Sequence, residues 1–157
     1  MRTHSLFQSS DFLEFVATST PIQNDVSLFL PFSKDLPTTT LHFSGASLFR
    51  IPYSWEDDEA MSRPNWNWSA QTWPGKLRQH VVWDFHPIHV VLNSNRHYEY
   101  LALKEFLKDR PLHDLKESEA KAFVNDGIGT RTYLRELLRN RDWSWMKIRD
   151  LSETKRT

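Results

Sequence analysis

Residues 80–93 read His-Val-Val-Trp-Asp-Phe-His-Pro-Ile-His-Val-Val-Leu-Asn, and this stretch decides how the middle of the chain is interpreted. The apolar residues at its start predict a buried strand over residues 79–85. Pro87 has no backbone N–H to give to a sheet, so the strand is expected to end before it. Asp84 and His86 lie two positions apart and therefore on one face of an extended segment. A carboxylate beside an imidazole at a strand end is a plausible site for proton transfer.

Two interpretations of His86 stay open at this point. It is either a hydrogen-bonded structural histidine or a general acid, oriented and kept protonated by Asp84. His89 follows three positions later, which puts it on the opposite face of a continued strand. A helix would bring the two imidazoles together, but Pro87 argues against one. We therefore predict no metal site from this pair, and nothing fixes the direction of His97.

The rest of the chain alternates helical and extended patterns. Ser9-Ser10-Asp11 is typical of a helix start, and an apolar stripe follows it. Strands are expected over residues 25–32, 40–43 and 47–52, and helices over residues 98–108 and 117–124. A further helix with an amphipathic stripe is expected after Gly129, with Thr130 as its N-cap. Interleaved strands and helices predict the α/β class.

Length and composition exclude several classes of protein. The 157 residues suit one domain, expected over residues 1–150 with a frayed polar tail over 151–157. Lys plus Arg and Asp plus Glu both number 20, which argues against a nucleic-acid partner. The absence of cysteine excludes disulfides, thiolate nucleophiles and Cys-ligated zinc. No segment resembles a membrane span or a secretory signal, so a cytoplasmic protein is expected.

The densest acidic cluster is Trp55-Glu56-Asp57-Asp58. It is either a solvated helix N-terminus, favoured by the helix dipole, or a hard-cation or acid/base site. Arg50 lies just before it and would then neutralise part of its charge.

Aromatic residues are unusually frequent, and five tryptophans lie close together in the sequence. These five are Trp55, Trp66, Trp68, Trp73 and Trp83. Core packing is the favoured explanation, because large aromatic side chains dominate buried area. A sugar-stacking surface is the alternative. The pattern Gly127-x-Gly129 is weak evidence for phosphate binding, since it lacks a third glycine and a preceding strand.

Several segments together resemble the NodB-type polysaccharide deacetylases (carbohydrate esterase family 4), and more narrowly a divergent branch from bacterial surface-polysaccharide gene clusters. The similarity covers most of residues 1–140. It is carried by the following strings: Arg2-Thr3-His4-Ser5-Leu6, Asn24-Asp25-Val26-Ser27, Phe49-Arg50-Ile51-Pro52-Tyr53-Ser54-Trp55-Glu56-Asp57-Asp58, Phe85-His86-Pro87-Ile88-His89 and Gly127-Ile128-Gly129-Thr130-Arg131.

The resemblance implies a partial, distorted (β/α) barrel that removes N-acyl groups from a sugar with a divalent metal ion, often zinc. It implies that His86 is the general acid, that Asp25 supports it and that Arg2 positions the base. Supporting roles fall to Asp84, His4 and His89. Substrate contacts at the rim fall to Arg50, Tyr53, Trp55, Glu56, Asp57 and Asp58. A rival assignment takes Arg50-Ile51-Pro52-Tyr53 as the family's Arg-x-Pro-Tyr motif, and its shorter spacing to His86 disfavours it.

The family's base and metal motifs are expected before Arg2, where the chain begins. The resemblance therefore assigns no metal ligand here and implies the C-terminal portion of a deacetylase, a fragment inactive alone or completed by a partner or a second copy. The alternative function is a non-catalytic carbohydrate-binding or protein-interaction domain.

Overall fold

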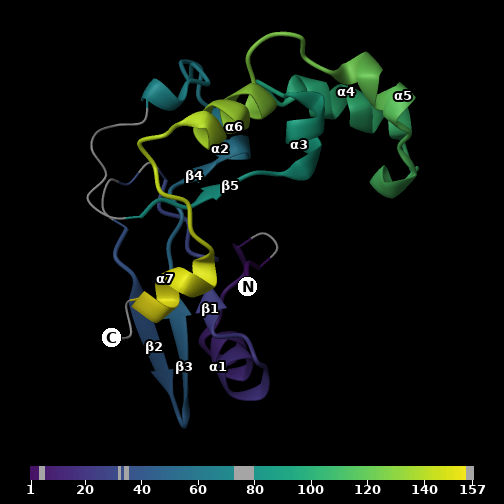
Figure 1. Cartoon of the computed structure of the whole chain (residues 1–157). Helices are drawn as coiled ribbons and strands as arrows, with labels where there is room; N and C mark the ends of the chain where they lie inside the picture. Colours follow the sequence, from purple (N-terminus) through teal and green to yellow (C-terminus); the bar gives the residue numbers. More distant parts are fainter. Residues whose placement is uncertain (4–5, 32, 34–35, 73–79, 155–157) are drawn as a thin grey trace. The chain divides into compact units, whose positions relative to one another are not determined.

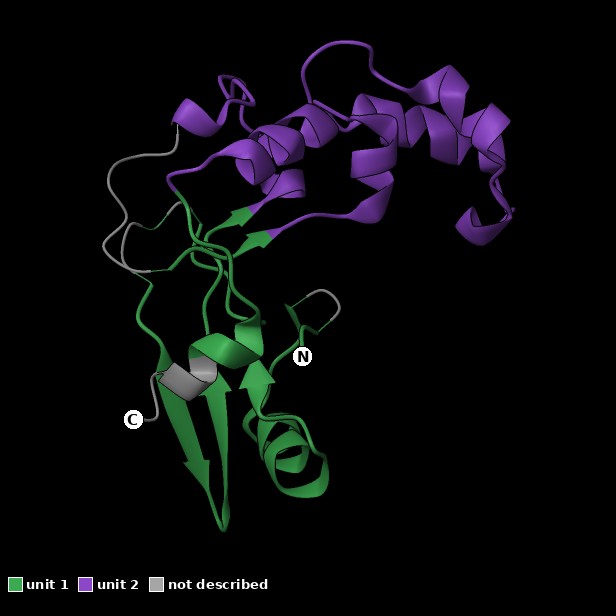
Figure 2. Cartoon of the chain, viewed as in Figure 1, with its two compact units in different colours: residues 1–55, 75–83, 143–157 green, residues 56–74, 84–142 purple. Residues whose placement is uncertain are grey.

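A computed structural model describes residues 1–3, 6–31, 33, 36–72 and 80–154. The chain forms two compact units (Figures 1 and 2). Unit 1 comprises residues 1–55, 75–83 and 143–157, and unit 2 comprises residues 56–74 and 84–142. The expectation of one domain over residues 1–150 stays a prediction, and each unit is described by itself.

Unit 1 is built on a three-stranded sheet of order β1-β3-β2. β2 (Thr39–Phe43) and β3 (Ala46–Arg50) pair antiparallel through a tight turn, in which Gly45 has a φ of 77°. A positive φ suits glycine, which explains why the two predicted strands join in a hairpin here. β1 (Asn24–Asp25) pairs parallel with β3 and places Asp25 opposite Arg50.

Two helices complete the core of unit 1. α1 (Ser10–Ser19) begins as predicted, because the Ser9 hydroxyl accepts a hydrogen bond from the Phe12 N–H at 3.2 Å. Leu13 and Val16 of α1 pack with Leu48 of β3. α7 (Ile148–Thr154) buries Leu151 against the sheet, so helical structure runs into the expected polar tail.

The strand predicted over residues 25–32 forms only in part. Asp25 belongs to β1, and Phe29 makes one isolated parallel bridge to Tyr53. Between them the buried Ser27 hydroxyl accepts the N–H of Thr3 at 2.9 Å, and the Ser27 carbonyl accepts the side chain of Gln8. Hydrogen bonds to the N-terminal segment thus replace a regular ladder.

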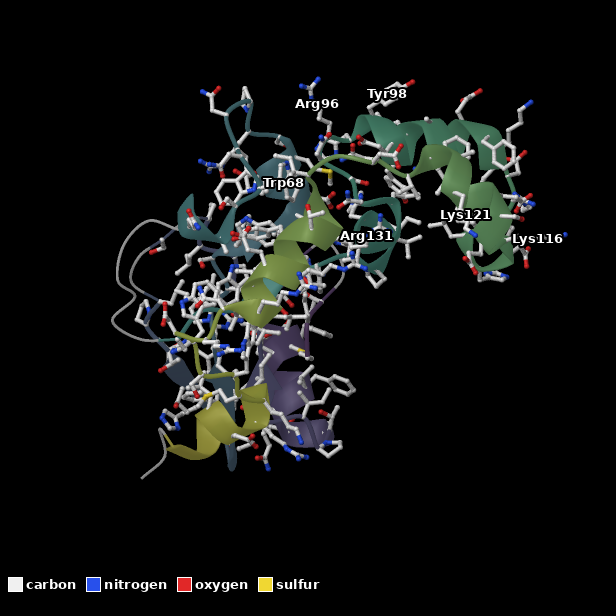
Figure 3. The ribbon with its side chains drawn as sticks, turned by 45° about the horizontal axis from the view of Figure 1, so that its top comes forward. Trp68, Arg96, Tyr98, Lys116, Lys121 and Arg131 are labelled. Carbon is white, nitrogen blue, oxygen red and sulfur yellow. The ribbon has the colours of Figure 1, made fainter. Side chains whose placement is uncertain are left out.

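Unit 2 is mainly helical. Its helices are α2 (Asp57–Met61), α3 (Pro87–Leu92), α4 (Tyr98–Leu107), α5 (Glu117–Ala120) and α6 (Thr130–Arg139). α3 packs against both α4 and α6, and Leu92, Leu103 and Leu107 form the core between α3 and α4. Arg131 of α6 donates a hydrogen bond to the carbonyl of Val91 on α3 (Figure 3).

The helix predicted over residues 98–108 forms as α4, although Tyr98 at its start is exposed (Figure 3). Two other expectations for this unit need correction. The helix predicted over residues 117–124 divides into α5 and a 3₁₀ turn over Lys121–Phe123. The N-cap of α6 is Gly129, and Thr130 is the first helical residue.

The strand predicted over residues 79–85 is shorter than expected. Only β5 (Trp83–Asp84) is formed, and it pairs with β4 (Trp55–Glu56) in a two-stranded sheet. Across the described residues the chain is a mixed α/β protein, which confirms the class, and no closed barrel is present there. The helices of that same part of the chain are all too short or too polar to cross a membrane.

Candidate functional site: two histidines and two aspartates

Pro87 starts a helix instead of excluding one. It occupies the first turn of α3, with His86 as the N-cap. Proline is favoured there because the first helical N–H groups have no partner within the helix and the ring fixes a helical φ. His86 and His89 therefore lie at i and i+3 on one helix, where neighbouring side chains meet. The expectation that Pro87 keeps the two imidazoles apart is wrong for this reason.

Asp57, the first residue of α2, binds His86. Its Oδ1 lies 2.6 Å from His86 Nδ1, and its Oδ2 accepts the His86 backbone N–H at 2.8 Å. Oδ1 also accepts the backbone N–H of Asp58 at 3.0 Å. Asp57 is fully buried. Both carboxylate oxygens are thus held by N–H groups, and they fix the imidazole of His86 in one orientation.

A second carboxylate–imidazole pair lies beside the first. His89 Nε2 lies 2.9 Å from Asp58 Oδ1, and His89 Nδ1 lies 3.3 Å from the Ser94 hydroxyl. His89 is 2% exposed, whereas the Asp58 side chain is 43% exposed. Asp58 Oδ2 lies 3.7 Å from His86 Nδ1. Asp58 therefore lies between the two histidines.

The other nitrogen of His86 faces further carboxylates. Nε2 lies 3.9 Å from Glu56 Oε1, and donor atoms of Glu56, Asp84 and His86 all lie within 4.8 Å of one another. The predicted proximity of Asp84 and His86 is confirmed. His86 is thus surrounded by negative charge, although its side chain is still 32% exposed.

This surrounding raises the pKa of His86 from 6.5 to about 9. The largest cause is the hydrogen bond to Asp57, which outweighs the opposing effect of burial, and the charges of Asp57, Asp58 and Asp84 act in the same direction. The pKa of Asp58 is lowered, chiefly by its hydrogen bond to His89. At neutral pH His86 is therefore an imidazolium held by carboxylates.

We expect the stability of the protein to fall as the pH rises from 7 to 10. The imidazole of His86 binds its proton more tightly in the folded protein than in the unfolded chain. Its contribution to the free energy of unfolding is therefore complete below pH 6.5 and is lost as the pH passes 9. About 2 kcal/mol is expected after allowing for the partial exposure of the side chain. Urea unfolding at several pH values measures it. His86→Gln should remove this pH dependence, and equal slopes in both proteins would contradict the assignment.

Asp57, Asp58, His86 and His89 also form a group of four potential metal-binding side chains within 4.8 Å. Imidazole nitrogens and carboxylate oxygens are donors that zinc accepts. Here, however, His86 Nδ1 and His89 Nε2 already lie in contact with carboxylate oxygens, and both oxygens of Asp57 accept N–H groups. An ion would have to displace a proton from His86. The group as arranged therefore fits proton transfer better than the family's metal, and no reaction step is routed through an ion.

The remaining predicted site residues lie in unit 1. The buried Asp25 pairs with Arg50, whose NH2 and Nε lie 2.8 and 2.9 Å from Oδ2. The guanidinium of Arg2 lies over the ring of Tyr53 at 5.6 Å, and Trp55 is fully buried. His4 lies outside the described residues. The catalytic and substrate-binding roles of these residues stay predictions.

Two of the four described tryptophans of the cluster are buried, and Trp66 and Trp83 are partly buried. Trp55 and Trp68 are buried, and Trp66 and Trp68 make edge contacts with Tyr133. Trp83 stacks on Trp143 with ring centroids 4.8 Å apart. Trp73 lies outside the described residues. Packing therefore accounts for most of the cluster.

The mixed α/β fold of this chain is similar to the fold of a solved protein described as acting on a polysaccharide. A solved structure from Bordetella bronchiseptica, WbmS, described as a candidate polysaccharide deacetylase involved in O-antigen biosynthesis, matches with a TM-score of 0.69 and 27% identity. The match covers 87% of this chain and 53% of that one, so the chain spans about half the length of WbmS.

The sequence identifies the family. The family model of WbmS-like polysaccharide deacetylases matches residues 1–104. The chain therefore belongs to the WbmS-like polysaccharide deacetylase family. The comparison with curated proteins gives no match.

His86 was predicted from the sequence, but with a different partner. Asp57 and Asp58 were expected on the rim of the site, and Asp25 was expected to support His86. The available signal was the acidic first turn of α2, since a carboxylate that begins a short helix has a fixed direction. Asp57 and His86 are 29 positions apart, too far for their pairing to be predicted from local spacing.

Proposed function

We propose that this chain provides the proton-donating part of a polysaccharide deacetylase, which hydrolyses N-acyl groups of amino sugars in a bacterial surface polysaccharide. Membership of the WbmS-like family and the likeness to a protein of O-antigen biosynthesis support the substrate class. The observation that carries the proposal is the 2.6 Å contact between His86 and the buried Asp57.

The geometry assigns each nitrogen of His86 a task. Nδ1 is held by Asp57, so Nε2 is the nitrogen that would donate a proton to the substrate. In amide hydrolysis, water oxygen bonds to the acyl carbon, the C–N bond breaks, and the departing amine nitrogen takes the proton from Nε2. Asp57 orients the ring and stabilises its charged form. We therefore assign the support of His86 to Asp57 in place of Asp25.

The family's metal ion, when bound, supplies a water molecule of lowered pKa. The described residues of this chain are assigned to the proton donor, and the motifs that the resemblance links to the metal are unmatched here. Arg2 and Asp25 keep the roles that the resemblance implies only as part of this proposal.

Acetate release from N-acetylated oligosaccharides tests the proposal when the chain is assayed together with the portion of a WbmS-like protein that carries the base and metal motifs. His86→Gln should lower the rate at least about 100-fold, as expected for loss of a general acid. His113→Gln is the matched control, because His113 is also in unit 2 and its side chain is 81% exposed. The control should keep the wild-type rate.

Two results would overturn the proposal. One is a wild-type rate in His86→Gln. The other is the absence of acetate release from the complemented wild-type chain that still binds the oligosaccharide, a result that would favour a carbohydrate-binding domain.

A further inference from the structure

His89 is a buried ionisable group that the proposed mechanism does not use. It is 2% exposed, and both ring nitrogens have partners, Asp58 at Nε2 and Ser94 at Nδ1. Burial of an imidazole is costly unless its nitrogens are hydrogen-bonded. One partner is buried, but the other is a half-exposed carboxylate beside His86. This arrangement links the core of unit 2 to the proton donor.

We infer that His89 is a positioning residue, which holds Asp58 as the second carboxylate partner of His86. The inference rests on the proposed function and extends it. Asp58 would otherwise be mobile, because its side chain is 43% exposed in the first turn of a five-residue helix. The 2.9 Å contact with His89 fixes Oδ1 and leaves Oδ2 3.7 Å from His86 Nδ1. At that distance a negative charge favours the imidazolium form.

The position of His89 is itself determined by the start of α6. Ser94 is fully buried, and its carbonyl accepts both the N–H and the hydroxyl of Thr130 at 2.8 Å. The backbone N–H of Ser94 donates to the carbonyl of His89 at 3.0 Å. The Asp58 carboxylate accepts at Nε2 of His89, and the Ser94 hydroxyl lies within hydrogen-bond distance of Nδ1. Contacts thus run from α6 through Ser94 and His89 to Asp58.

Other ionisable groups lie close to Asp58 and His86, and they determine which control variants are needed. His97, which precedes α4, lies 4.0 Å from Asp58 Oδ1 through its Nδ1. The ionisable groups around His86 are Glu56 from β4, Asp57 and Asp58 from α2, Asp84 from β5 and His89 from α3. His89 also makes an edge contact with the ring of His86, with centroids 5.7 Å apart, so the double variant with Asp58→Asn is needed to separate this direct contact from the effect through Asp58.

The proton titration of His86, followed by NMR through its ring proton Hε1, tests the inference in the full chain. Asp58→Asn should lower the midpoint by about one pH unit, a tenfold loss of proton affinity. His89→Leu should lower it similarly, and the double variant should lower it no further. His89→Gln should retain the wild-type midpoint, because its side-chain amide can place an N–H group close to the position that Nε2 of His89 occupies in the wild-type protein. His97→Gln is the control and should leave the midpoint unchanged.

A purely structural His89 would give a different pattern. His89→Leu would then lower the melting temperature without moving the titration of His86, and this outcome overturns the inference. If His89→Leu does not fold, an unchanged midpoint in Asp58→Asn still overturns the inference, because His89 would then have no second carboxylate partner to hold. Asp57→Asn separates the two proposals. If the midpoint of His86 falls in Asp57→Asn but not in Asp58→Asn, only the inference about His89 is overturned. If the midpoint changes in neither variant, the assignment of Asp57 as the partner of His86 is overturned as well.

Discussion

Replacing Asp25 by alanine is expected to lower the free energy of unfolding by about 3–5 kcal/mol. Asp25 is fully buried and holds the guanidinium of Arg50 at 2.8 Å, and the Arg50 side chain is only 13% exposed. The substitution leaves a buried positive charge without its partner. Such a charge costs more than the original ion pair contributes, because the desolvation penalty remains. Urea unfolding followed by tryptophan fluorescence measures the change, since Trp83, Trp143 and Trp145 lie in unit 1.

The same chain offers a matched control on the surface. Glu59 and Arg63 form an ion pair at 3.0 Å on α2 and the residues after it, with both side chains substantially exposed. Glu59→Ala should cost less than about 1 kcal/mol. Replacing Asp25 and Arg50 together by Leu and Met should recover most of the stability lost in Asp25→Ala. A loss in Asp25→Ala no larger than that in Glu59→Ala would contradict the argument.

Glycine is required at position 129 for a different reason. A Cβ there would lie 2.1 Å from the carbonyl oxygen of Asn93 and 2.9 Å from that of Ser94. Both obstacles are backbone atoms, so no side-chain rotation relieves the clash. The backbone would have to move away from the contacts that Thr130 and Thr132 make with Asn93 and Ser94. Gly129→Ala should therefore cost about 3 kcal/mol or more.

Gly127→Ala is the control for this second substitution. Its added Cβ would meet only the side-chain oxygen of Asn125, at 3.4 Å. We expect a loss below about 1 kcal/mol, measured by thermal and urea unfolding of both variants. Because Ser94 also contacts His89, Gly129→Ala should shift the midpoint of the His86 proton titration as well. Equal stability of the two variants would show that the backbone at the start of α6 can move with little loss of stability.

Local patterns were sufficient for several elements of the fold. The serine before α1 was recognised as a helix start, and β2 and β3 were recognised as strands, because a cap and an extended pattern depend on a few consecutive residues. The stripe of α6 likewise predicted the burial of Tyr133 and Leu137. By contrast, Gly127-x-Gly129 suggested a phosphate loop only weakly, and the structure explains Gly129 by close backbone packing.

The sequence by itself determined the α/β class, the two strands of the hairpin and most helix starts, and it made His86 a candidate site residue, since these depend on neighbours along the chain. Only the tertiary structure decided which carboxylates surround that histidine. Asp57 lies 29 residues from His86, and Asp25 lies 25 residues from Arg50. Pro87 was compatible with either a strand end or a helix start, and packing of α3 against α4 and α6 selected the helix. Contacts over such separations depend on how whole elements pack, and no local propensity encodes them.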